Sequence, residues 1–135
     1  MADTPDERLA RGMQTAAKLF PPSPARTSPR FTYPPEIAGD WNSFSVSTVL
    51  GDVWSRPGLD MKYRSMITIA ALTALNKPDQ LRAYITAGLN LGLTREEVCE
   101  IIFQMAVYAG FPAAIQAFAV ANDVFQDLDK VTGEP

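Results

Sequence analysis

Residues 93–114 read LTREEVCEIIFQMAVYAGFPAA, and this stretch decides the fold. Thr94 and Glu97 have the spacing of a capping box, so a helix is expected to begin at this point. Apolar residues then recur at intervals of three and four, which is typical of a helix with one buried face. They are Val98, Ile101, Ile102, Met105 and Ala109. Pro112 stands at a first helical position and is expected to open another helix, rich in alanine.

Two more helices are predicted immediately upstream. Pro78 opens a helix with a single apolar stripe, and Gly92 ends it. That stripe consists of Leu81, Tyr84, Ile85, Gly88 and Leu89, so the Tyr84 side chain is expected to point inward. Asp60 is placed to cap a helix over residues 61–75. Its later part is apolar nearly all round, which indicates a position in the middle of a bundle.

The N-terminal part predicts two helices joined by a proline-rich arm. The helices cover residues 4–20 and 36–50, and one face of the second is expected to be buried. Their apolar stripes are Leu9, Met13, Ala16 and Ala17 in the first, and Ile37, Trp41, Phe44 and Thr48 in the second. Residues 21–35 contain six prolines in 15 positions, which opposes both helix and sheet. We expect an extended arm anchored on a neighbouring surface by Phe31 and Tyr33.

The predicted fold class is therefore all-α, a bundle of about six helices with a proline-rich N-terminal arm. No alternating runs of β-branched residues interrupt the series. A chain of 135 residues is long enough for one core and too short for two. We expect a short helix and arm over residues 1–34, the helical domain over residues 35–129, and a tail over residues 130–135. A loop is expected at residues 51–58, where Gly and Pro break the helical pattern.

Two predicted helices are apolar on a second face as well. Phe103 and Val107 lie opposite the core face of one helix, and Ile115 and Phe118 extend the apolar surface of the next. This is more hydrophobic surface than a monomer of this length can hide, so a homo-oligomer is expected. The alternative is that these are scattered surface residues, which are common in soluble proteins.

The amino-acid composition argues against several kinds of chemistry and several kinds of partner. The chain has no histidine, and its single cysteine, Cys99, permits neither an internal disulfide nor a CxxC pair. The 12 basic and 15 acidic residues give a net charge of −3 without a basic stripe, which argues against nucleic acid as a partner. No apolar run approaches the roughly 20 residues that span a bilayer, and the N-terminus carries acids where a signal peptide carries bases. We expect a cytoplasmic protein without a membrane partner.

Three segments carry a family resemblance. They are GDVWSRPGLDMKYRSMITIAALTAL at residues 51–75, PDQLRAYITAGLNLGLTREEV at residues 78–98 and QMAVYAGFPAAIQAF at residues 104–118. The chain resembles the carboxymuconolactone decarboxylase family, and its decarboxylase branch more than its hydroperoxidase branch with a redox CxxC. The resemblance implies an all-α subunit in a trimer or hexamer, with sites near subunit contacts. It also implies a cofactor-free lyase of aromatic degradation that acts on a small carboxylated lactone or related carboxylic acid.

Two motif positions differ from the family pattern. In the decarboxylase branch a histidine usually stands in the helix after the Leu-Arg pair, at the place that Tyr84 holds here. In the hydroperoxidase branch the redox cysteines precede that histidine, at the places held here by Lys77 and Gln80. The resemblance therefore implies a decarboxylase frame with an altered mechanism, and thiol chemistry would have only Cys99 to use.

Five residues are candidates for the site. Arg56 and Arg64 are predicted to clamp a carboxylate, because guanidinium groups bind carboxylates bidentately. Tyr84 is predicted to be catalytic as a donor of a hydrogen bond or proton, since its reference pKa is about 10. Trp54 and Tyr108 are expected to bind substrate in the same pocket. No metal ligand set is predicted.

Each candidate also has a structural alternative. Arg56 is alternatively an ordinary loop contact, Arg64 the partner of a structural acid, and Tyr84 and Tyr108 packing residues. Cys99 is more simply a small buried hydrophobe. Three functional hypotheses stay open at this stage: a decarboxylase, a non-catalytic oligomer that binds an acidic metabolite, and a thiol-dependent hydroperoxide reductase.

Overall fold

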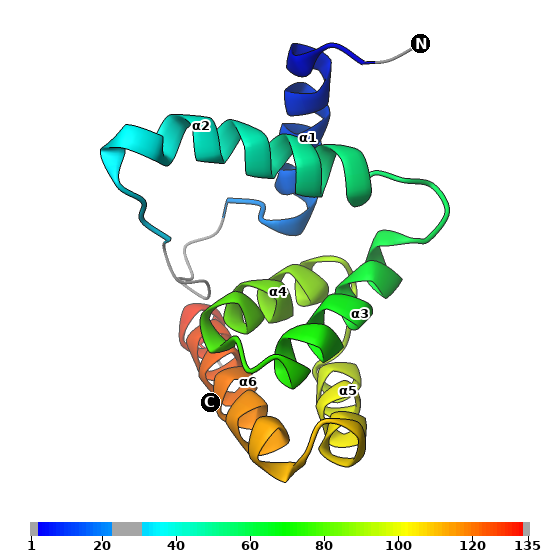
Figure 1. Cartoon of the computed structure of the whole chain (residues 1–135). Coiled ribbons are helices and arrows are strands. Elements are labelled where there is room, and N and C mark those ends of the chain that lie inside the picture. Colours follow the sequence, from blue (N-terminus) through cyan, green and yellow to red (C-terminus); the bar gives the residue numbers. More distant parts are fainter. Residues whose placement is uncertain (1–2, 23–30, 134–135) are drawn as a thin grey trace.

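The computed structural model describes residues 3–22 and 31–133, and within them it contains helices and no strand. The helices are α1 (Pro5–Leu19), α2 (Pro35–Ser45), the π-helix η1 (Val46–Val53), α3 (Met61–Ala74), α4 (Pro78–Asn90), α5 (Arg95–Tyr108) and α6 (Phe111–Thr132). The predicted all-α fold with six α-helices is confirmed. Figure 1 shows α2 and η1 as one rod crossing α1, while α3 to α6 form a separate group of helices below them.

Local sequence signals account for most of the helix ends. In the predicted capping box, Glu97 N–H donates to Thr94 Oγ1 (3.0 Å) and Thr94 N–H donates to Glu97 Oε1 (2.9 Å). Asp60 Oδ1 accepts a hydrogen bond from the Lys62 amide (2.9 Å) at the start of α3. Asn76 (φ 56°) follows α3 and Gly92 (φ 105°) follows α4, both with the positive φ that commonly ends a helix.

The larger core lies among α3, α4, α5 and α6. The helical periodicity selects four of its buried members: Leu81, Ile85, Val98 and Ile102. The others include Ile69, Ala114, Ala117, Ala121 and Val124. A smaller core lies between α1, η1 and α4, where Leu19, Leu50, Trp54 and Ala87 are buried together. The Tyr84 side chain contacts both cores, so its predicted inward position is confirmed.

Two isoleucines on α3 allow a test of which residues belong to the larger core. Ile69 is 0% exposed, whereas Ile67 on the same helix is 59% exposed. Ile69→Ala is expected to lower the free energy of unfolding by about 2–5 kcal/mol, because it removes buried methyl groups and leaves a cavity. Ile67→Ala, the control, is expected to change it by less than about 0.5 kcal/mol. Urea denaturation of both variants checks this, and equal losses would contradict the assignment of the core.

Three predictions about helix faces are wrong. The α2 face that we expected to be buried is exposed, and Phe44 is 60% exposed, because the ribbon of α2 runs outward from the other helices (Figure 1). The exposed rings contact each other instead: Trp41 lies 6.0 Å from Tyr33 and 6.1 Å from Phe44 between centroids. The α3 helix packs against α4, α5 and α6, but it is not buried all round, since Ile67 and the following Leu75 are exposed.

The stripe predicted for α1 is the third error. Gly12, Thr15 and Leu19 are its buried residues, and Met13 is exposed. The reason is a close backbone approach through Gly12, which an apolar periodicity does not register. The helix predicted to end near residue 50 also continues to Val53, within the segment where we expected a loop.

The structure tests the remaining predictions only in part. Most of the proline-rich arm lies outside the described residues, and Phe31 and Tyr33 are exposed at its end. The predicted division at residues 34 and 129 stays a prediction, although α6 runs to Thr132. Among the described residues, no helix has the length and apolar character needed to cross a membrane. The same described residues contain no group of three or more Cys, Asp or Glu side chains placed to hold a metal ion.

Candidate active site

A small pocket lies between the π-helix η1 and helix α4. It has a volume of about 150 Å³ and is lined by Ser45, Val46, Val49, Leu50 and Tyr84. Four of these five residues come from η1 or the residue before it, and Tyr84 comes from the middle of α4. The wall is mostly aliphatic, so the Tyr84 phenol is the acidic proton donor that this pocket offers.

The Tyr84 ring is held between two aromatic side chains. Trp54 stacks on it with centroids 5.8 Å apart and an interplanar angle of 27°, and Phe20 meets it edge-on at 6.0 Å and 75°. Burial raises the pKa of Tyr84 above its ordinary value, because desolvation disfavours the phenolate. Within the described part of the chain its hydroxyl forms no hydrogen bond. Because no buried side-chain polar atom of the described residues lacks a partner, this hydroxyl is open to solvent, and it is a protonated donor at neutral pH.

The pocket wall has an unusual backbone. Over Val46–Val53 the hydrogen bonds close wider turns than in an α-helix, and Trp54 N–H bonds to Val49 O (2.9 Å), five residues back. Such π-helical turns are rare and occur frequently at functional sites. The wider turn rotates the residues around the helix axis relative to an α-helix. It thus determines which side chains of η1 face Tyr84.

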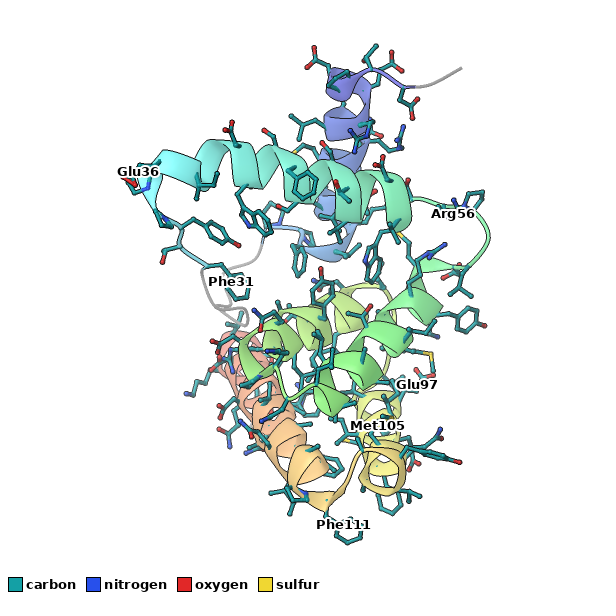
Figure 2. All side chains as sticks on the ribbon, viewed as in Figure 1. Phe31, Glu36, Arg56, Glu97, Met105 and Phe111 are labelled. Carbon is teal, nitrogen blue, oxygen red and sulfur yellow. The ribbon has the colours of Figure 1, made fainter. Side chains whose placement is uncertain are left out.

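The two arginines do not enter this pocket. Arg64 Nε donates to Leu59 O (3.1 Å) and its Nη2 donates to Arg56 O (3.1 Å), so this guanidinium holds the loop that follows η1. Its partners are carbonyls and not the structural acid that we considered as an alternative. Arg56 is exposed and lies on the outer side of that loop (Figure 2). Neither guanidinium is among the pocket-lining groups of one chain.

Tyr108 is remote from Tyr84. It is the last residue of α5, is 79% exposed, and precedes Phe111, which Figure 2 shows at the far end of the molecule from α2. Of the five predicted site residues, the single chain brings together Tyr84 and Trp54. Phe20 and the η1 residues of the pocket are not among the predicted site residues. Phe20 is an aromatic residue at the end of α1, which is a sequence signal for packing, whereas the sequence has no clear signal for π-helical turns.

A second hollow lies at the other end of the molecule. It is a groove of about 370 Å³ between α5 and α6, and its lining is entirely apolar. The lining residues are Phe103, Ala106, Val107, Phe111, Ala114, Ile115 and Phe118. This groove contains the exposed apolar residues from which the sequence predicts an oligomer. We call it the α5/α6 groove.

Cys99 has the surroundings of an unreactive thiol. It is half-buried, and its pKa is raised by desolvation and by the nearby charges of Glu96 and Glu100. A thiolate is the reactive form, so these neighbours suppress the chemistry that a peroxide reductase requires.

Comparison with known proteins places the chain in a family. Residues 42–123 match the Carboxymuconolactone decarboxylase family, and the chain belongs to this family. It is 44% identical over 89 residues to a 4-carboxymuconolactone decarboxylase of Acinetobacter baylyi, a match that covers 66% of each protein. It is 32% identical over 104 residues to a nitrosuccinic acid decarboxylase of Metarhizium robertsii, covering 76% of this chain and 68% of that protein.

A third relative is an uncharacterized 15.0 kDa protein of Paracoccus denitrificans. It is 40% identical over 83 residues, which are 59% of this chain and 61% of that protein. These matches therefore span about two thirds of the length of the relatives. The family match begins within α2 and ends within α6, so the whole of α1 precedes it.

Proposed function

We propose that this protein is a decarboxylase of a small carboxylic acid, and that the reaction takes place against Tyr84 in the η1/α4 pocket. The observation that carries the proposal is the Tyr84 phenol, which is clamped by two aromatic rings and left without a hydrogen-bond partner among the described residues. Two relatives are named for decarboxylating 4-carboxymuconolactone and nitrosuccinic acid. Both names denote acids that carry an electron-accepting group, a lactone or a nitro group, which suggests the substrate class.

The proposed reaction needs one bond to break and one proton to move. The bond between carbon and carboxylate breaks, CO₂ leaves, and the electron pair enters the conjugated acceptor of the substrate. The Tyr84 hydroxyl then donates its proton to carbon and regains one from water. The aliphatic wall of Val46, Val49 and Leu50 favours this step, because a localised carboxylate tolerates an apolar surrounding less well than a delocalised anion does.

The same phenol takes the place of the histidine that the family pattern has in α4. An imidazole titrates near neutral pH, whereas the raised pKa of Tyr84 keeps its proton in place throughout that range. The proposed enzyme thus uses a general acid and lacks a general base at this position.

This role of Tyr84 predicts the pH profile. The required form is the neutral phenol, which is present below the raised pKa of Tyr84 and lost as the pH rises through it. Turnover is therefore expected to stay level from about pH 7 to 9, below the ordinary tyrosine pKa of about 10. Initial rates of CO₂ release in constant ionic strength check this. A decline centred between pH 7 and 9 would assign the proton to another group.

We further propose that the carboxylate clamp comes from a neighbouring copy. Within the described residues four arginines form ion pairs with aspartates, and Arg64 binds carbonyls. Arg56 is exposed and has no such partner there, so its charge is available to an acid bound at the face of another subunit. The four paired arginines are Arg8, Arg11, Arg82 and Arg95.

The clamp predicts a binding defect in Arg56→Gln. Loss of a charge-assisted hydrogen bond of about 1.5–3 kcal/mol is expected to lower kcat/KM by roughly 10- to 150-fold, chiefly through KM. Lys62→Gln, on the neighbouring α3 helix, is the control for loss of one positive charge. Steady-state kinetics with 4-carboxymuconolactone and nitrosuccinate as separate substrates make the test. Equal constants for the two variants would remove Arg56 from the site.

The second candidate function is a non-catalytic binder of an acidic metabolite. The observation that favours it is the lack of any cation or general base among the lining groups of the pocket in one chain. Thermal shift measurements separate the two functions, because a binder is stabilised by acids that it never converts. Peroxide consumption is expected to be the same in wild type and Cys99→Ser, in keeping with the suppressed thiol.

A further inference from the structure

Helix α1 lies before the part of the chain that matches the family, yet it packs against η1, whose residues line the pocket. Two glycines bring its backbone against η1. A Cβ on Gly12 would lie 2.4 Å from Val46 O, and a Cβ on Gly51 would lie 2.5 Å from Arg8 O. Real side chains do not come that close to backbone oxygen atoms, so any larger residue at either position forces the two helices apart. Val46, which touches Gly12, is itself a lining residue of the pocket.

Ion pairs and hydrogen bonds also join the first turns of α1 to the last residues of η1. Arg8 Nε donates to both carboxylate oxygens of Asp52 (3.1 Å each), and Arg8 Nη2 approaches Oδ2 at 2.6 Å. Arg11 Nη2 donates to the same carboxylate (3.2 Å) and its Nε donates to Gly51 O (2.6 Å). These hydrogen bonds from arginine lower the pKa of Asp52. The guanidinium groups of Arg8 and Arg11 on α1 thus bind the end of η1 together.

The other end of α1 contacts α4, the helix that carries Tyr84. Leu19 is fully buried in the smaller core with Leu50 and Trp54, and its carbonyl accepts a hydrogen bond from Asn90 Nδ2 of α4 (2.8 Å). Phe20, directly after α1, meets the ring of Tyr84. One helix therefore touches both the π-helical wall and the helix that carries the phenol.

We infer that α1 is a positioning element for the reaction, and that Gly12 and the Arg8–Asp52 pair set the separation of η1 and Tyr84. This inference rests on the proposed function, because it assigns to α1 the geometry of that pocket. Misplacement of a reacting group by about 1 Å costs about 100-fold in rate. Loosening α1 is thus expected to impair turnover through a residue that never touches the substrate.

The test compares two matched carboxamide substitutions. Asp52→Asn weakens the ion pair of α1 with η1, and the control Asp127→Asn weakens the ion pair of Arg82 with α6. Both aspartates are partly exposed and bind an arginine of another helix. Asp52→Asn is expected to lower kcat by about 10- to 100-fold, and Asp127→Asn to leave it unchanged. Gly12→Ala, a second route to the same displacement, is expected to resemble Asp52→Asn.

A spectroscopic readout makes the test independent of turnover. The phenolate absorption of Tyr84 is obtained by subtracting the alkaline titration of Tyr84→Phe from that of each protein. In Asp52→Asn and Gly12→Ala, Tyr84 is expected to ionise at lower pH than in wild type, because the separated helices admit water to its ring. In Asp127→Asn it is expected to ionise as in wild type.

The outcomes distinguish the two proposals. If Asp52→Asn and Asp127→Asn share the same kcat and the same Tyr84 titration, α1 is not a positioning element. If wild type releases no CO₂ from any acid tested, the proposed function fails. In that case a lower Tyr84 titration in Asp52→Asn still supports the clamp by α1, and an unchanged titration overturns it.

Discussion

Replacing Tyr84 by phenylalanine is expected to lower kcat for decarboxylation by about 10²- to 10⁴-fold, which is the usual contribution of a positioned general acid. The substitution removes one hydroxyl and keeps the ring that stacks on Trp54 and meets Phe20, so the pocket retains its packing. KM is expected to change little, because the proton is transferred after the carboxylate is bound. Rates of CO₂ release at saturating substrate make the measurement.

Two further variants sharpen that prediction. Tyr63→Phe removes a phenol hydroxyl from an exposed ring on α3 and is expected to have the kinetics of wild type. Tyr84→His introduces the histidine that the family resemblance implies at this position and is expected to be active, with a new dependence on a group that titrates near pH 6.5. If Tyr84→Phe keeps more than half of the wild-type kcat, the phenol is not the acid. If wild type is inactive and Tyr84→His gains activity, the protein as it stands is the binder.

The helical core was predictable because its signals are local. The α4 and α5 stripes of Leu81, Ile85, Val98 and Ile102 are buried as their spacing requires, and the capping box begins α5 where expected. The π-helix was not predictable in this way. Its turns contact α1 through residues far away in sequence, such as Arg8 with Asp52, 44 residues apart, and local periodicity does not register such contacts.

Exposure of apolar faces also depends on more than the sequence of one helix. Ile37, Trp41 and Phe44 have a regular helical spacing, but among the described residues no helix of the same chain covers that side of α2. A periodic pattern indicates that a face is to be covered and does not say by what. The same reasoning accounts for Ile67 on α3, which is exposed beside a fully buried Ile69.

The proximity of two candidate residues was predictable in part. Tyr84 was chosen from the family resemblance, and Trp54 of the motif GDVWSRPGLD stacks on its ring, whereas their roles stay predictions. Arg56 and Arg64 belong to the same motif, but one guanidinium is exposed and the other is bound to loop carbonyls. Charge and position in a motif thus identify a residue type, whereas the direction of a long side chain is set by hydrogen bonds that the sequence does not display.

The α5/α6 groove is the surface that we propose to be covered by a second copy of this chain. Its lining is entirely apolar, and Val107 at its edge is 77% exposed. Three exposed aromatic residues, Phe103 and Phe111 in its lining and Tyr108 beside them in sequence, present about 300–500 Å², a large part of the roughly 800 Å² that each partner contributes to a stable interface. A symmetric contact places the same groove on both subunits, so one substitution acts twice.

Val107→Asp is therefore expected to dissociate the oligomer. A carboxylate buried in an apolar interface costs several kcal/mol, and a two-fold contact buries two of them, so the dissociation constant is expected to rise by more than about 10³-fold. Sedimentation velocity at micromolar concentration measures the assembly. The control Gln126→Glu adds the same charge to an exposed position of α6 outside the groove and is expected to sediment like wild type. A monomeric wild type, or an intact oligomer of Val107→Asp, would show that the groove is not the subunit contact. Because the groove lies at the other end of the molecule from the η1/α4 pocket, Val107→Asp is also expected to leave the titration of Tyr84 as it is in wild type.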